Sequence, residues 1–74
     1  MIFDMPMLGH VMEEGTVSSW LKNDGDTVEK GEVIVQIETD KSVLDVEAPE
    51  GGVLKIIASE GDVVPVGEPI AEIN

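Results

Sequence analysis

Two apolar runs in the middle of the chain flank a short polar segment. Residues 33–38 form a run rich in β-branched side chains, and residues 43–48 alternate between apolar and polar positions. Both patterns are typical of β-strands. The segment 39–42 between them has no glycine, which favours a type I turn over the primed turns that need positive φ. Asp40 and Lys41 then take the two central positions, and Lys41 points into water at the tip of a hairpin.

The chain also repeats itself with a shift of 36 positions. Residues 7–38 align with residues 43–74, and eleven of the aligned pairs are identical. Solenoids need about three or more copies of a repeat, so two copies indicate one domain with quasi-twofold symmetry. Under this symmetry the mate of the 39–42 turn is the place where the chain begins and ends. Lys41 is therefore expected at the far end of the domain from both termini.

Each half shows the same order of strands and turns. Long strands are expected at 3–8, 16–22 and 33–38 in the first half, and at 43–48, 52–58 and 70–73 in the second. Glycine-containing turns are expected at 23–26, 29–32, 59–62 and 65–68, with a short strand between the two turns of each half. No segment holds a helical apolar stripe, because glycine or proline interrupts most windows. The pattern predicts an all-β fold in which two small antiparallel sheets pack face to face as a flattened barrel with quasi-twofold symmetry.

The amino-acid composition argues against several classes of binding function. Sixteen acidic residues face four lysines, for a net charge of −12 over 74 residues. This charge repels nucleic acid and anionic membranes and favours partners with a basic surface. Cysteine is absent and His10 is the single soft metal ligand, so we expect no zinc site. Asp24 and Asp26 resemble the start of a calcium loop, but the glutamate at its twelfth position is missing, so we expect no metal. With no visible signal peptide or membrane span, we expect a cytoplasmic protein.

Short motifs along essentially the whole chain are similar to those of the lipoyl domain in the biotinyl/lipoyl carrier family. They are Met5-Pro6, Glu14-Gly15-Thr16, Trp20-Leu21-Lys22, Gly25-Asp26, Gly31 and Glu38-Thr39-Asp40-Lys41. The most specific feature is the Asp-Lys turn at the centre of a self-similar β sequence. The resemblance implies a barrel-sandwich hybrid fold over residues 1–74, as a single lipoyl domain in the N-terminal part of a longer acyltransferase.

The same resemblance implies a noncatalytic carrier in which Lys41 bears lipoic acid through an amide bond. A lipoate–protein ligase or lipoyl-transferring enzyme would attach the group. A thiamine-diphosphate-dependent dehydrogenase would load it with an acyl group, the acyltransferase core would receive that group, and a dihydrolipoamide dehydrogenase would reoxidise the carrier. Our hypothesis is that Glu38, Thr39, Asp40 and Ser42 form the recognition site around the lysine.

Some motifs bear on the choice of complex. The stretch from Glu14 to Trp20 resembles pyruvate-type and acetoin-type acyltransferases more than branched-chain or oxoglutarate types. Residues 61–67 slightly favour an acetoin-type acyltransferase. The His10-Val11-Met12 stretch departs from the small and polar residues more usual there. We therefore expect a pyruvate-type or acetoin dehydrogenase complex.

Three other functions compete with the lipoyl carrier. Biotin carriers have methionine on both sides of the lysine, whereas Asp40 and Ser42 flank Lys41 here. An unmodified interaction module and a small enzyme are the other two. The acidic neighbours of Lys41 favour its charged ammonium form, which makes a spontaneous catalytic nucleophile the weakest alternative.

Other side chains receive simpler interpretations. Lys22, Lys30 and Lys55 are expected to be ordinary solvated residues, and Trp20 to be core or half-buried. His10 is expected in a loop near the partner-facing end. Met5, Met7 and Met12 are expected to be packing or near-surface apolar residues.

Overall fold

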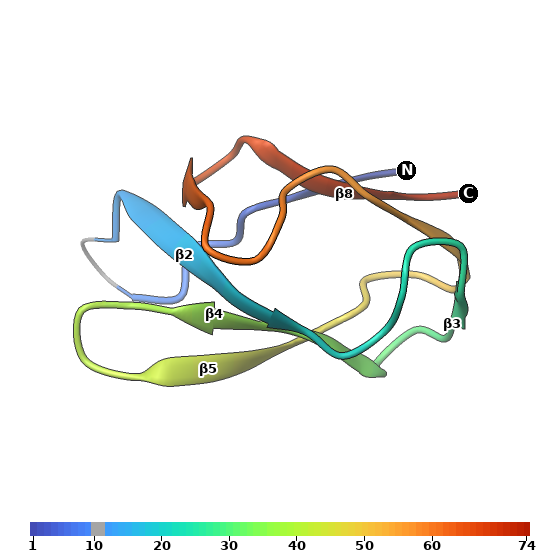
Figure 1. Ribbon diagram of the computed structural model, residues 1–74, viewed down its shortest axis with the longest axis horizontal. Coiled ribbons are helices and arrows are strands. Elements are labelled where there is room, and N and C mark those ends of the chain that lie inside the picture. The colour runs from blue at the N-terminus through green and yellow to red at the C-terminus, as the bar shows by residue number, and fades with distance from the viewer. Residues whose placement is uncertain (10–11) are drawn as a thin grey trace.

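The computed structural model describes residues 1–9 and 12–74, and within these ranges the chain forms strands and turns without a helix (Figure 1). The strands are β1 (Ile2–Asp4), β2 (Glu14–Trp20), β3 (Thr27–Val28), β4 (Val33–Glu38), β5 (Val43–Glu47), β6 (Gly52–Ile56), β7 (Val63–Pro65) and β8 (Pro69–Ile73). No helix that could cross a membrane occurs in the described part of the chain.

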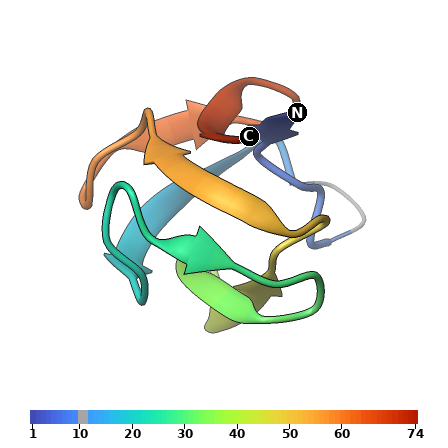
Figure 2. The same ribbon diagram turned by 90° about the vertical axis from the view of Figure 1, so that its right-hand side faces the viewer.

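The strands form two four-stranded antiparallel sheets, as predicted. One sheet has the order β1-β8-β6-β3 and the other the order β5-β4-β2-β7. Figure 2 shows the two sheets from the end of the domain at which both termini lie. Their inner faces share one core of apolar side chains, and no polar or charged side chain is buried among the described residues. The fully buried members include Ile34, Ile37, Leu54 and Ile70.

The predicted strand positions are close to the observed ones, with one clear error. The strand at 33–38 is observed as predicted, and those at 16–22, 43–48, 52–58 and 70–73 differ by one or two residues at their ends. The strand expected at 3–8, however, ends at Asp4. The Met5 N–H donates to the Glu68 carbonyl at 2.8 Å, and the Met5 carbonyl accepts from the Gly67 N–H at 3.0 Å. The chain after Asp4 is thus bonded to a turn rather than to a continuing strand.

Backbone hydrogen bonds show that the two halves interlock. The turn 23–26 of the first half bonds to Leu54 of β6 in the second half, at 2.7 and 2.8 Å. The turn 59–62 of the second half makes the equivalent pair of bonds to Val17 of β2, at 2.7 and 2.9 Å. Each half therefore supplies the turn that closes the second strand of the other half, and the predicted quasi-twofold symmetry is confirmed.

Turn carboxylates add a second symmetric pair of bonds between the halves. The Asp24 carboxylate accepts from the backbone N–H of Ile56 at 2.7 Å, and the Glu60 carboxylate accepts from the backbone N–H of Trp20 at 2.9 Å. Both acceptors are charged, which makes such bonds stronger than neutral ones. These acidic residues satisfy backbone donors of the opposite half in addition to adding solubility.

The symmetry fails in the connection that follows the first strand of each half. Met5 and Ala48 each bond to the second glycine turn of the opposite half in the same way, although they are 43 positions apart rather than 36. The predicted alignment of residues 7–38 with residues 43–74 therefore fails at its start, where it pairs Leu8 of this connection with Leu44 of β5. The connection from β1 to β2 spans residues 5–13, whereas the connection from β5 to β6 spans only residues 48–51.

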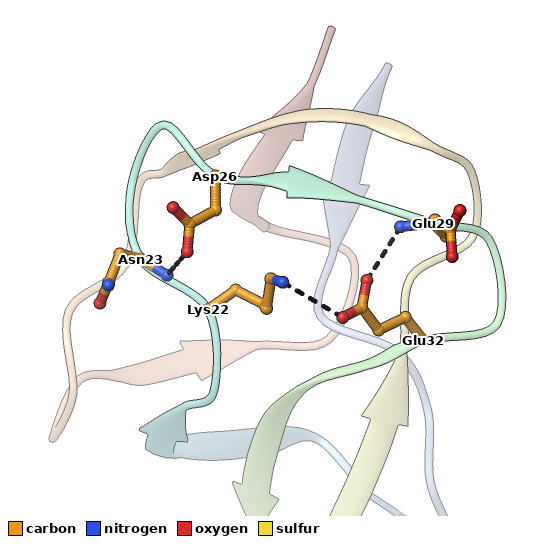
Figure 3. Close-up of polar contacts among 5 residues, drawn as sticks. All are labelled: Lys22, Asn23, Asp26, Glu29 and Glu32. Atoms are coloured by element: carbon orange, nitrogen blue, oxygen red, sulfur yellow. Dashed lines mark hydrogen bonds and ion pairs between the residues drawn. The ribbon is translucent and has the colours of Figure 1, made fainter.

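Lys22 is predicted to be an ordinary solvated residue, but it forms an ion pair. Its Nζ lies 3.3 Å from Oε2 of Glu32 (Figure 3). The other carboxylate oxygen of Glu32 accepts a 3.0 Å hydrogen bond from the Glu29 N–H. Two contacts hold the pKa of the Glu32 carboxyl below its usual value. The hydrogen bond from the Glu29 N–H has the larger effect, and the Lys22 side chain has the next largest. The symmetry mate of Glu29 is Pro65, which has no N–H, so this arrangement belongs to the first half alone.

We predict that Glu32 contributes to the acid sensitivity of the fold. Because its folded-state pKa is lowered, its ionised form stabilises the fold above the unfolded-state pKa, and this contribution is lost as pH falls through the folded-state pKa. Glu32→Gln should therefore be less stable than wild type near neutral pH, and the difference should shrink as the pH is lowered. Urea denaturation at several pH values measures this, with the exposed Glu50→Gln as control. A difference that stays constant with pH would contradict the prediction.

Candidate functional site

The hairpin between β4 and β5 holds Lys41 at its tip. The Thr39 N–H donates to the Ser42 carbonyl at 2.8 Å, which leaves Asp40 and Lys41 as the two central residues. No residue other than glycine has a positive φ in the described ranges, so the turn is not of a primed type. Both observations agree with the turn predicted from its lack of glycine.

The Thr39 hydroxyl organises this turn. It donates to the Ser42 carbonyl at 3.0 Å and faces the backbone N–H groups of Ser42 and Lys41 at 3.3 and 3.4 Å. A threonine hydroxyl that bonds backbone groups two and three residues ahead stabilises a tight turn locally. Thr39 is one of the residues predicted to form the recognition site, and these contacts give it a structural role in addition.

We predict that the Thr39 hydroxyl stabilises the hairpin by about 1 kcal/mol, since its bonds lie at a partly exposed turn. Thr39→Val keeps the shape and β-branching of the side chain but removes the bonds, so it should lower the free energy of unfolding by that amount and speed amide exchange at Ser42. Thr27→Val is a matched control, because Thr27 is exposed on β3 and makes no side-chain hydrogen bond in the described structure. Equal stability of the two variants would exclude this role for Thr39.

The site is exposed and lies at the end of the domain opposite the chain ends (Figure 1). Glu38, Asp40, Lys41 and Ser42 are all exposed, whereas Thr39 is half-buried. Within the described residues Lys41 has no ion pair, although Asp40 precedes it in the same hairpin. The predicted separation of Lys41 from both termini is confirmed.

A groove runs beside the hairpin, between it and the described parts of the long β1–β2 connection. The hairpin contributes residues 38–42 and Leu44 to its lining, and β2 and the connection contribute Leu8, Gly9 and residues 12–16. Leu8, Met12 and Leu44 are half-buried apolar residues, whereas Glu13, Glu14, Glu38 and Asp40 are exposed. The groove therefore combines an apolar strip with an acidic rim, and Lys41 is part of its lining.

Gly15 and Met12 shape the floor of this groove. A Cβ atom at Gly15 would lie 2.7 Å from Met12 Cε, 2.8 Å from Ile37 Cγ2 and 3.0 Å from Met5 Sδ, so only glycine fits without displacing these atoms. The Met12 sulfur is also 3.3 Å from the backbone N–H of Leu8. The position of Met12 thus depends on a missing side chain in β2, a relation that no local sequence pattern indicates.

The structure also locates the other residues singled out above. The indole N–H of half-buried Trp20 donates to the Ala58 carbonyl at 2.9 Å. Met5 is buried, but Met7 is 61% exposed. His10 lies outside the described residues. The described part of the chain contains no group of three or more potential metal ligands.

Comparison with known proteins identifies the family. The family model described as biotin-requiring enzyme, which covers biotin and lipoyl domains, matches residues 2–73. A solved lipoyl domain from the 2-oxoglutarate dehydrogenase complex of Azotobacter vinelandii superposes with a TM-score of 0.79 at 38% identity, covering 99% of this chain and 94% of that one. The chain belongs to the biotinyl/lipoyl carrier family, as a lipoyl domain. A lipoyl domain is a carrier module and not itself a catalytic one.

The curated relatives of this lipoyl domain are much longer proteins. The succinyltransferase component of the 2-oxoglutarate dehydrogenase complex of Staphylococcus saprophyticus is 49% identical over 71 residues, which is 95% of this chain and 17% of that protein. The acetyltransferase component of the acetoin cleaving system of Bacillus subtilis is also 49% identical, over 95% of this chain and 18% of that protein. The β subunit of the pyruvate dehydrogenase E1 component of Rhizobium meliloti is 51% identical, over 90% of this chain and 15% of that protein. The chain thus spans less than a fifth of each relative, and the similar identities do not distinguish the kinds of complex.

Proposed function

We propose that Lys41 is the attachment site for lipoic acid and that the domain carries acyl groups and reducing equivalents between the enzymes of a dehydrogenase complex. The observation that supports this best is an exposed lysine at the tip of an ordered hairpin, opposite both chain ends, in a lipoyl domain. A tether at either terminus would then leave Lys41 facing outward. Lipoic acid bound there supplies a dithiolane that can accept an acyl group together with electrons.

The exposed hairpin fits such an attachment. Lys41 projects from a turn held by the Thr39 hydroxyl, and it has no competing ion pair among the described residues. We expect acylation of Lys41 to require an enzyme that supplies an activated acid and removes a proton. We propose that a lipoate–protein ligase or lipoyl-transferring enzyme fills this role and recognises Glu38, Asp40 and Ser42 around the lysine.

The names of the relatives support the remaining partners that we propose. Their names point to complexes with a dehydrogenase component and an acyltransferase component. We infer that a thiamine-diphosphate-dependent dehydrogenase, an acyltransferase core and a dihydrolipoamide dehydrogenase act in turn on the loaded domain, in the cytoplasm. Covalent tethering keeps the carried group at a high effective concentration near each active site, so each encounter can be weak.

We propose an acyltransferase of a pyruvate-type or acetoin complex as the parent protein, with this domain in its N-terminal part. The similarity to an E1 β subunit in Rhizobium meliloti makes a dehydrogenase subunit the second candidate. Determining which polypeptide contains this sequence in the cell, by mass spectrometry of the intact parent, would decide between them.

A biotin carrier is the alternative function, because the matched family includes biotin domains. The residues around Lys41 favour lipoic acid, since Asp40 and Ser42 stand where biotin carriers have methionine. The two functions differ in the ligase that modifies the lysine.

The expected outcome of incubation with an active lipoate–protein ligase, lipoic acid and ATP is one lipoyl increment in the intact mass. Lys41→Arg, which keeps the charge, should show none. Lys30→Arg is the matched control, because Lys30 is also an exposed turn lysine, and this variant should be modified like wild type. No increment on the folded wild-type domain, with the ligase active on a known carrier, would contradict the proposal, and modification by a biotin ligase would establish the alternative.

A further inference from the structure

The groove beside Lys41 lies next to a connection that is longer than its counterpart in the second half. One wall comes from the long β1–β2 connection, and the equivalent β5–β6 connection spans only residues 48–51. The described lining residues of this connection, Leu8, Gly9, Met12 and Glu13, therefore form a surface at the end of the domain that presents Lys41. A role for this surface has to be compatible with its lining.

The charges on the lining restrict what the groove can bind. Its apolar strip consists of Leu8, Met12 and Leu44. The carboxylates of Glu13, Glu14, Glu38 and Asp40 lie around it, and they repel an anion such as a free fatty acid or a phosphate. An uncharged apolar chain is the ligand that this combination accepts.

Gly15 gives the apolar strip its depth. The Met12 methyl group lies only 2.7 Å from the position that a Cβ atom of residue 15 would take, so a larger residue there would displace it. The Met12 side chain is half-buried. A thioether is polarizable, and the flexible methionine side chain fills irregular gaps between its neighbours. Met12 thus offers a soft apolar contact close to the hairpin.

We propose that this groove is the resting site of the arm attached to Lys41, with the hydrocarbon chain and dithiolane against Leu8, Met12 and Leu44. This inference rests on the proposed function. Amide formation removes the charge of Lys41, so the attached arm is uncharged and apolar, as the groove requires. Because Lys41 itself lines the groove, the arm begins at its edge, and tethering populates even a weak contact. The carrier therefore alternates between a docked arm and an extended one.

The methionines provide a direct test by NMR of domain labelled with ¹³C at the methionine methyl groups. Met12 lines the groove, Met1 and Met7 are exposed outside its lining, and Met5 is buried below Gly15. Lipoylation should shift the Met12 signal more than those of Met1 and Met7. Leu44→Ser should reduce that shift, whereas Leu21→Ser, at an exposed leucine outside the groove lining, should leave it unchanged.

A chemical readout tests the same docking. If the arm rests in the groove for most of the time, its dithiolane should react with a small water-soluble phosphine about five-fold more slowly than free lipoamide, because only the extended fraction reacts. Leu44→Ser should restore most of the rate. A rate equal to that of free lipoamide, together with an unshifted Met12 signal, would overturn the inference.

The two proposals can fail separately. A domain that the ligase leaves unmodified refutes the lipoyl function, and Lys41→Cys alkylated with an octyl chain then tests the groove without the ligase. A Met12 shift in that conjugate supports the groove as a seat for an apolar chain. A Met12 signal that responds only to an added dehydrogenase component, and never to the attached chain, would assign the groove to the partner and overturn the inference.

Discussion

The backbone bonds that join each glycine turn to the second strand of the opposite half hold this domain together. The turn 23–26 closes on β6, and the turn 59–62 closes on β2. A chain of 74 residues buries only roughly 60% of the surface that it exposes when unfolded, and this one has no disulfide to compensate. The interlock compensates by making the two halves one cooperative unit, since neither half contains the turn that completes its own second strand.

This arrangement also decides where Lys41 lies. In a quasi-twofold fold the β4–β5 hairpin is the mate of the place where the chain ends meet, so the hairpin tip and the termini lie at opposite ends (Figure 1). Lys41 can then be exposed without weakening the core, because the two sheets bury only apolar side chains among the described residues. The symmetry provides the placement, and the long β1–β2 connection, which breaks the symmetry, adds the surface next to the lysine.

Much of the fold could be predicted from the sequence because local patterns determine it. The β-branched run at 33–38 forms β4 with the predicted bounds, and Gly25, Gly31, Gly61 and Gly67 adopt φ between 87 and 93° in the predicted turns. Long-range contacts account for the rest. β1 ends early because Met5 bonds to a turn more than sixty residues away, and Lys22 finds Glu32 across two turns.

The candidate site shows the same division. The hairpin and the exposure of Lys41 follow from residues adjacent in sequence. The fit of Met12 against Gly15 and Ile37, and the groove that results, depend on packing between three separate segments, which no period or motif encodes. The role of the Thr39 hydroxyl could have been predicted from the sequence, because a threonine hydroxyl often accepts a hydrogen bond from the backbone N–H two residues ahead.

We propose that the ordered turn, rather than a lysine among acidic residues, defines the attachment site. The most direct test exchanges the two central residues, Asp40→Lys with Lys41→Asp, which leaves composition and net charge unchanged. The intact mass of this double variant is measured after incubation with the lipoate–protein ligase, with its fold checked by urea denaturation. We predict a folded domain that gains no lipoyl increment under conditions that modify wild type completely. Complete modification of the exchanged lysine would contradict the account.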